Sequence, residues 1–168
     1  ADADAVPGNI QCTVTMTAGT DEYPYQEQQT INLDLTLSQF GFPLDGIVVK
    51  SSPIIADLDS DGMKEIYFGS DNEALHGYNS FGEEIDGFPF QSTDRVRSSP
   101  AVGDVDNDGQ MEIIFGNSSG KLYIVNHDGS RELAYTLLGF VESTPALVDI
   151  DGDQDLEIFF TTTTTSGG

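Results

Sequence analysis

The chain has 168 residues, with 29 Asp or Glu against 6 Lys or Arg, so its formal charge is −23. Nucleic-acid binding depends on Lys and Arg that neutralise phosphates, and this charge balance therefore excludes it. Hydrophobic residues make up 38% of the chain, which is enough for a modest core and argues against wholesale disorder. No run of about 18 apolar residues is present, so we expect no membrane-spanning helix.

The N-terminal part of the chain has two stretches in which apolar and polar residues alternate. Residues 1–8 are expected to be a flexible N-terminus, compatible with the start of a mature secreted chain. The alternation over residues 10–17 and 31–37 predicts two strands, and the polar segment 18–30 is expected to be a loop. Region 9–46 is therefore an N-terminal β-hairpin or a degenerate copy of the repeat that follows it.

The rest of the chain contains an internal repeat. Its three copies are SSPIIADLDSDGMKEIYFG at 51–69, SSPAVGDVDNDGQMEIIFG at 98–116 and STPALVDIDGDQDLEIFFT at 143–161. Each copy has a Ser/Thr-Pro step that favours an extended backbone, an apolar run, an acidic loop and a second apolar run. Short apolar runs rich in aromatic and β-branched residues are typical of buried strands, so the acidic loop is predicted to be the turn of a β-hairpin.

A second hairpin is predicted after the first in two of the copies. Residues 75–79 align with 122–126, and a turn with glycine follows each segment. Four strands in a period of about 40 to 50 residues are typical of a propeller blade. The predicted fold is all-β, with four-stranded β-propeller blades at 47–93 and 94–140, a partial blade at 141–160 and a Thr/Gly-rich tail at 161–168. Closed propellers have about four to eight blades, so an incomplete or open propeller is expected.

The acidic loops are candidate metal sites. In each loop, carboxylates occupy positions 1, 3, 5 and 9, and position 7 offers a backbone carbonyl. The predicted ligands are Asp57, Asp59, Asp61, Met63 and Glu65 in the first loop, Asp104, Asp106, Asp108, Gln110 and Glu112 in the second, and Asp149, Asp151, Asp153, Asp155 and Glu157 in the third.

Calcium is the ion that this pattern favours. Converging carboxylates repel one another, and a hard cation that takes six to eight oxygen ligands relieves that repulsion. An EF-hand is excluded because its closing Glu stands at position 12, where this chain has Phe68, Phe115 and Phe160. Two or three Ca²⁺ ions are expected, and the third site is the weakest because Gln154 takes the place of the glycine found at position 6 in the other loops.

These features resemble the FG-GAP or VCBS repeats of extracellular β-propellers, which include the head of integrin α-subunits. The resemblance is carried by the Ser/Thr-Pro step, the DxDxDGxxE loops, and the pairs Phe68-Gly69 and Phe115-Gly116. It implies a calcium site in the loop between the first two strands of each blade, bound by side chains at positions 1, 3, 5 and 9. It also implies a protein that is secreted or on the cell surface.

No catalytic constellation is evident, and we expect the chain not to be an enzyme. His76 and His127 hold different places in their repeats, and the serines beside proline lack a nucleophile elbow. Arg95 and Arg97 are expected to form salt bridges with the acidic surface. Asn117 begins a glycosylation sequon, so a glycan is a candidate modification.

The function expected from the sequence is structural or adhesive. An open propeller exposes sheet edges and apolar faces, so we expect self-association, for example into a fibre, or binding to another extracellular protein. Two alternatives remain: a non-catalytic propeller piece of a larger secreted enzyme, and a carbohydrate-binding propeller.

Overall fold

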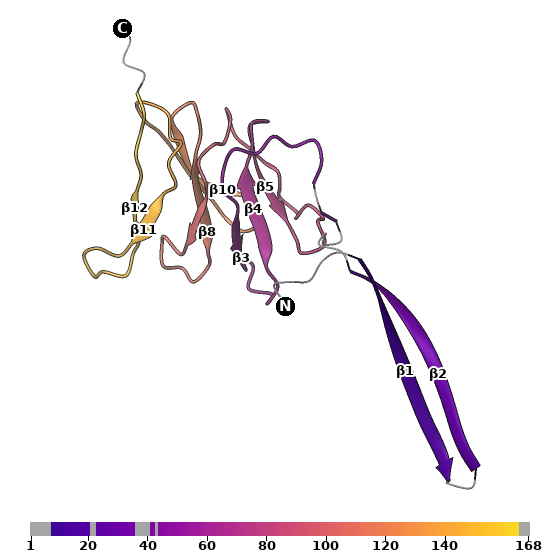
Figure 1. Ribbon diagram of the computed structural model, residues 1–168. Coiled ribbons are helices and arrows are strands. Elements are labelled where there is room, and N and C mark those ends of the chain that lie inside the picture. The colour runs from indigo at the N-terminus through magenta and orange to yellow at the C-terminus, as the bar shows by residue number, and fades with distance from the viewer. Residues whose placement is uncertain (1–7, 21–22, 36–40, 43, 165–168) are drawn as a thin grey trace. The chain divides into compact units, whose positions relative to one another are not determined.

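A computed structural model describes residues 8–20, 23–35, 41–42 and 44–164 (Figure 1). The chain divides into two compact units, Ala1–Pro43 and Leu44–Gly168. The regular structure of the described residues is β throughout, which confirms the predicted all-β class. Among these residues there is no helix with the length and apolar character needed to cross a membrane. The predicted flexible N-terminus lies almost entirely outside the described residues, as does the end of the predicted tail.

The first unit contains one long two-stranded hairpin. Strands β1 (Gly8–Thr20) and β2 (Tyr23–Leu35) pair antiparallel in a continuous register, from Gly8↔Leu35 to Thr20↔Tyr23. The prediction of a polar loop over residues 18–30 is therefore wrong. Backbone pairing satisfies the N–H and C=O groups whatever the side chains, and Thr and Tyr in this segment favour extended structure, so polarity alone does not mark a loop.

The second unit contains two four-stranded antiparallel sheets and one two-stranded sheet. The first sheet has the order β3 (Ile54–Ala56), β4 (Glu65–Gly69), β5 (Ala74–Tyr78), β6 (Phe90–Gln91). The second runs β7 (Ala101–Gly103), β8 (Glu112–Gly116), β9 (Lys121–Val125), β10 (Arg131–Thr136). The third pairs β11 (Ala146–Val148) with β12 (Glu157–Phe159). The predicted four strands per repeat are confirmed in the first two copies, and the array is not closed, as in an incomplete propeller-like fold.

The apolar core lies between successive sheets. Tyr67 of the first sheet belongs to the same buried cluster as Ile113 and Phe115 of the second. Ile114 of the second sheet belongs to another cluster, against which Ile158 of the third sheet packs. Successive residues of β8 therefore point alternately to the sheet before and to the sheet after. Burial on both sides explains why the apolar run of this strand is unbroken.

Successive repeats meet at a seam that is built the same way twice. The Val96 amide donates to the carbonyl oxygen of Ser70 at 3.0 Å, and the Val141 amide donates to that of Asn117 at 3.1 Å. Both valines are completely buried. Each comes from the segment that leads into a repeat, and each docks on the repeat before it.

The glycine of each Phe-Gly pair is required by this seam. A Cβ on Gly69 would lie 2.4 Å from the carbonyl oxygen of Val96, and one on Gly116 would lie 2.2 Å from Cγ1 of Val141. The Cβ of a real residue essentially never comes this close to a non-bonded atom, so the next repeat would have to move. The Phe-Gly motif is thus the acceptor surface for the following repeat.

Replacement of Gly116 by Ala is predicted to lower the free energy of unfolding by about 3 kcal/mol, because the added methyl overpacks the seam. Gly46→Ala is the matched control, since its Cβ meets nothing within 4 Å. Its positive φ should cost only about 1 kcal/mol. Chemical denaturation of both variants measures the difference, and equal losses would show that the seam does not need glycine.

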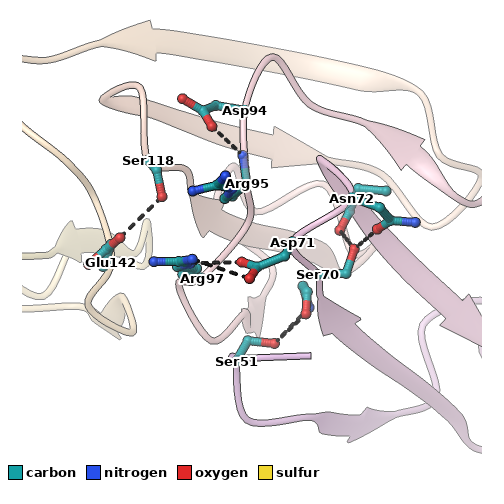
Figure 2. A network of polar contacts seen from close by, with 11 residues as sticks. Ser51, Ser70, Asp71, Asn72, Asp94, Arg95, Arg97, Ser118 and Glu142 are labelled. Carbon is teal, nitrogen blue, oxygen red and sulfur yellow. Dashed lines mark hydrogen bonds and ion pairs between the residues drawn. The ribbon is translucent and has the colours of Figure 1, made fainter. Parts of the chain in front are cut away.

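An ion pair crosses the first seam, and Figure 2 shows it beside the neighbouring polar groups. Arg97 donates from Nε to Asp71 Oδ1 at 2.7 Å and from its terminal nitrogen to Asp71 Oδ2 at 3.2 Å. The expected salt bridge is thus found for Arg97. The hydrogen bond from Arg97 lowers the pKa of Asp71.

Stability conferred by this ion pair should be lost at acidic pH. A folded-state pKa below the unfolded value means that the contribution is present above the unfolded pKa and disappears as the pH falls through the folded one. Asp71→Asn should therefore lower the melting temperature at pH 7, and its deficit against the parent should narrow as the pH falls below about 4. Asp45→Asn serves as the charge-matched control. A deficit that stays constant with pH would contradict the role of this carboxylate.

Candidate metal centres

Each acidic loop connects the first two strands of a repeat. The strand pairs at the bases of the loops are Ala56↔Glu65, Gly103↔Glu112 and Val148↔Glu157. The glutamate at position 9 therefore stands at the start of the second strand, and the aspartate at position 1 directly follows the first. Strand pairing brings the two ends of the carboxylate pattern together.

The three loops share one set of hydrogen bonds from backbone amides to carboxylates. The position 6 amide donates to the position 1 aspartate at 3.0 to 3.1 Å, and the position 7 amide donates to the position 5 aspartate at 2.7 to 3.0 Å. The position 2 amide donates to the position 9 glutamate at 2.8 to 3.2 Å. Repeated geometry of this kind shows that the spacing of the acids fixes the shape of the loop.

Position 6 requires a left-handed backbone in all three loops. Its φ is +89° at Gly62, +90° at Gly109 and +84° at Gln154. The third loop departs from the other two in sequence but not in this conformation. Gln154 therefore holds a backbone angle that favours glycine, and the strain falls on the third loop.

Gln154→Gly is predicted to raise the free energy of unfolding. Removal of the left-handed strain gains about 1 to 2 kcal/mol, and the greater freedom of glycine in the unfolded chain returns about 0.5 to 1 of it. The reciprocal variant Gly109→Gln should lower stability by a similar net amount. Denaturant titration of both variants measures the effect, and two variants that match the parent would show that position 6 carries no strain.

The carboxylates of each loop gather closely enough to share one cation. The first two groups unite positions 1, 3 and 5, whereas the third unites positions 1, 3 and 9. Within each group, one oxygen from each residue lies within 4.8 Å of the others. The groups are Asp57, Asp59 and Asp61; Asp104, Asp106 and Asp108; and Asp149, Asp151 and Glu157.

The remaining predicted ligands lie around these groups. Glu65 and Glu112 are buried at position 9 and accept the position 2 amides, and Asp153 accepts an amide within its own loop. Met63, Gln110 and Asp155 occupy position 7, on the exposed side of the loops. The carbonyl ligands expected at position 7 remain a prediction.

The electrostatics of the first two loops favour a bound cation. Burial raises the pKa of Glu65 and of Glu112, and the loop aspartates add to this effect, while the amides of Leu58 and Val105 partly offset it. Asp57 Oδ1 is buried and accepts no hydrogen bond among the described residues. A buried carboxylate oxygen without a donor, surrounded by other carboxylates, is suited to an oxygen-seeking cation.

Further carboxylates face the first loop. Glu83, Glu84 and Asp86, in the connection between β5 and β6, line the same cavity as Asp59 and Asp61. Sequence reasoning missed them because they follow the loop by about twenty residues and only the sheet topology brings them back to it.

Glu132 is a neighbour of this kind for the second loop. It lies in β10, at a shift in register between Arg131 and Leu133. Burial raises the pKa of Glu132, and the charges of Asp106 and Asp108 raise it further. An acidic residue after the third strand of both repeats was the available sequence signal.

The family comparison agrees with the geometry of the loops. A family model described as an FG-GAP-like repeat matches residues 57–115 and 104–160. The chain belongs to this family. The matched segments contain all three acidic loops, which confirms the resemblance found in the sequence. No curated protein matches the chain.

His76 has a structural place in the first FG-GAP repeat. The ring is buried, with Nδ1 3.2 Å from Glu84 Oε1 and Nε2 3.2 Å from Asn72 Oδ1. The Ser70 hydroxyl is also buried and donates to Asn72 and to the Ala74 carbonyl. Asn72 thus stands between serine and histidine, so this group lacks the Ser–His contact of a hydrolase triad.

Asn117, the sequon residue, is also part of the fold. Its side-chain nitrogen donates to Ser92 Oγ at 2.9 Å and to Thr93 Oγ1 at 3.1 Å, and the residue is fully buried. Its Oδ1 accepts the amides of Ser119 and Lys121. A glycan on Asn117 would have to displace these contacts, which explain the Asn-x-Ser pattern without a modification.

Proposed function

We propose that this chain is a calcium-stabilised β-propeller domain with a structural or adhesive role outside the cell and no catalysis of its own. The observation that carries the proposal is the identical amide-to-carboxylate pattern in three loops, together with membership of the FG-GAP-like repeat family. In this proposal β3–β6 and β7–β10 are two blades, and β11–β12 is the first half of a third.

The residues of each loop would hold Ca²⁺ through the carboxylates at positions 1, 3, 5 and 9 and the carbonyl at position 7. All are hard oxygen donors, and the loop can adapt to the irregular coordination that calcium accepts. When bound, the ion supplies positive charge that offsets carboxylate repulsion. The protein's own groups do the rest: the amides hold the carboxylates inward, and the position 9 glutamate ties the loop to the second strand.

The extracellular location rests on the family and on charge. FG-GAP repeats are typically extracellular, and calcium modules of low affinity operate where calcium is abundant. A formal charge of −23 also suits a domain that binds several cations.

The non-catalytic role is supported by the hydrogen bonds that the candidate catalytic side chains make within the fold. The loop carboxylates are committed to loop geometry, and His76 and Ser70 are tied into the first sheet. The carbohydrate-binding alternative needs an exposed platform of neighbouring aromatic side chains. Tyr67, Phe115 and Tyr123 are buried, and the two most exposed aromatic side chains of the described residues, Phe81 and Tyr135, belong to different repeats.

Calcium is predicted to raise the melting temperature, and EDTA to reverse the effect. An ion present at 100 times its dissociation constant stabilises the fold by about 2.7 kcal/mol per site. The double variant Asp104→Asn/Asp106→Asn should lose part of this response, because it removes two ligands of the second loop. The control Asp45→Asn/Asp94→Asn carries the same charge change outside the loops and should keep the full response.

Magnesium at equal concentration separates specific binding from charge screening. Differential scanning calorimetry in calcium, magnesium and EDTA should show the large shift with calcium alone. The same melting temperature in calcium and in EDTA would reject the proposed function.

A further inference from the structure

The connection between β5 and β6 brings a carboxylate to the first acidic loop from outside that loop. Glu84 lines a cavity of about 450 Å³ together with Asp59, Asp61 and Glu65 of the loop. An isolated β-bridge pairs Glu84 with Tyr78 at the end of β5 and fixes the backbone of the connection there. The cavity is thus shared by the loop of the first hairpin and by a segment of the second hairpin.

The orientation of Glu84 is set by a buried histidine. Nδ1 of His76 lies 3.2 Å from Glu84 Oε1, and His76 is only 4% exposed. An ionised carboxylate can only accept hydrogen bonds, so Nδ1 of His76 carries the hydrogen of this contact. The side chain of Glu84 is itself 38% exposed. A donor inside the sheet therefore holds a carboxylate that reaches the cavity.

The ring of His76 is fixed in its place. It stacks on Phe68, its partner in the pair of β4 and β5, with ring centres 5.4 Å apart. Its Nε2 lies 3.2 Å from Asn72 Oδ1, which also accepts a hydrogen bond from the buried hydroxyl of Ser70. Because the ring face and both ring nitrogens have partners, His76 cannot turn away from Glu84 without losing these contacts.

The neighbouring Glu83 lines the same cavity but is held differently. Asn79 Nδ2 donates to Glu83 Oε2 at 3.0 Å, so this carboxylate closes the turn of its own hairpin. Glu84 is instead surrounded by ring groups of the sheet. Burial, and then the charge of Glu84 and its hydrogen bond, raise the pKa of Tyr78. Glu84 thus differs from Glu83 in having its support inside the sheet.

The second repeat carries other residues at both places. The pairs across the strands identify the equivalents: Tyr123 stands at the place of His76, and Arg131 stands at the place of Glu84. The Tyr123 hydroxyl lies 3.2 Å from Thr93 Oγ1, and a positively charged arginine repels a bound cation. The pair of His76 and Glu84 therefore distinguishes the first loop from the second.

We propose that Glu84, held by His76, belongs to the first cation site and faces the bound ion from outside the loop. The inference rests on the proposed function, because it needs calcium in the loop whose Asp57 Oδ1 is buried without a donor among the described residues. Groups that orient the oxygens around a metal typically change its affinity about 10- to 100-fold. Glu84 is then a binding residue, and His76 is a positioning residue.

Isothermal titration calorimetry tests Glu84 in a chain whose second and third loops are disabled, so that the heat reports the first loop. Glu84→Gln should weaken Ca²⁺ binding by about 10-fold or more. Glu73→Gln is the matched control, since it removes the same charge from the same repeat outside the cavity. It should change the affinity less than about 2-fold at physiological salt, which screens distant exposed charges. The substitutions that disable the other loops are Asp104→Asn, Asp106→Asn, Asp149→Asn and Asp151→Asn.

A double-variant cycle tests whether His76 acts through Glu84. His76→Phe keeps a ring against Phe68 but removes the Nδ1 donor, and it should weaken Ca²⁺ binding about 10-fold. In the Glu84→Gln background the same substitution should have no further effect, because the carboxylate that it orients is gone. His76→Gln retains an N–H donor and should restore part of the affinity. Two losses that simply add would overturn the positioning role of His76.

Melting temperatures of the full chain separate a binding role from a structural one. In calcium, Glu84→Gln should melt below the control Glu73→Gln. In EDTA it should melt no lower than this control, because it removes one of the carboxylates that repel one another in the cavity. Equal deficits in calcium and in EDTA would overturn the proposal, as would an unchanged Ca²⁺ affinity of Glu84→Gln beside a parent chain that binds calcium. A parent chain that binds no calcium would reject the proposed function and this inference together.

Discussion

Repulsion among carboxylates held at three hairpin turns is the constraint on which the rest of this structure depends. A hairpin turn can be made with two residues. In each repeat, however, eight residues separate the first two strands, and acids face one another in this loop. Backbone amides that donate hydrogen bonds to the carboxylates hold these side chains inside the loop, but they do not cancel the negative charge. Under the proposed function, a cation bound in each loop offsets this repulsion at neutral pH.

The seam between repeats follows from the same hairpin. The second strand leaves the acidic loop, runs through the core and ends at the Phe-Gly pair, where the next repeat docks. Order in the loop therefore sets the position of the seam glycine through one short strand. Under the proposed function, an ion bound in the loop would contribute through this strand to the packing of sheets that it does not touch.

Much of this architecture could be predicted from the sequence because the same pattern of apolar runs and acidic loop recurs in each repeat. Three aligned copies of the acidic spacing locate the hairpins, and the apolar runs between turn residues locate β4, β8 and β12. Gln154 replaces the glycine found at position 6 of the other two loops, but its backbone keeps the same left-handed conformation. The hydrogen bonds of the surrounding carboxylates outweigh the preference of one residue.

Contacts between residues far apart in the chain could not be predicted from the sequence. An acid follows the third strand in each of the first two repeats, but only the fold shows that Glu83 and Glu132 face the acidic loop of their own repeat. The segment 18–30 was misjudged for the opposite reason, because a polar strand in a two-stranded hairpin lacks the apolar signal of a buried one. Asn117 shows the same limit, since a short motif cannot reveal that its side chain is enclosed.

The number of calcium ions bound per chain tests the central claim most directly. Isothermal titration calorimetry of the calcium-stripped chain should saturate at three ions, with the third loop the weakest because Gln154 strains it. Saturable binding of three ions would tie each loop to one metal. Absence of saturable binding at millimolar calcium would contradict the account, because the loops would then be solvated turns whose charge the fold tolerates without a cation.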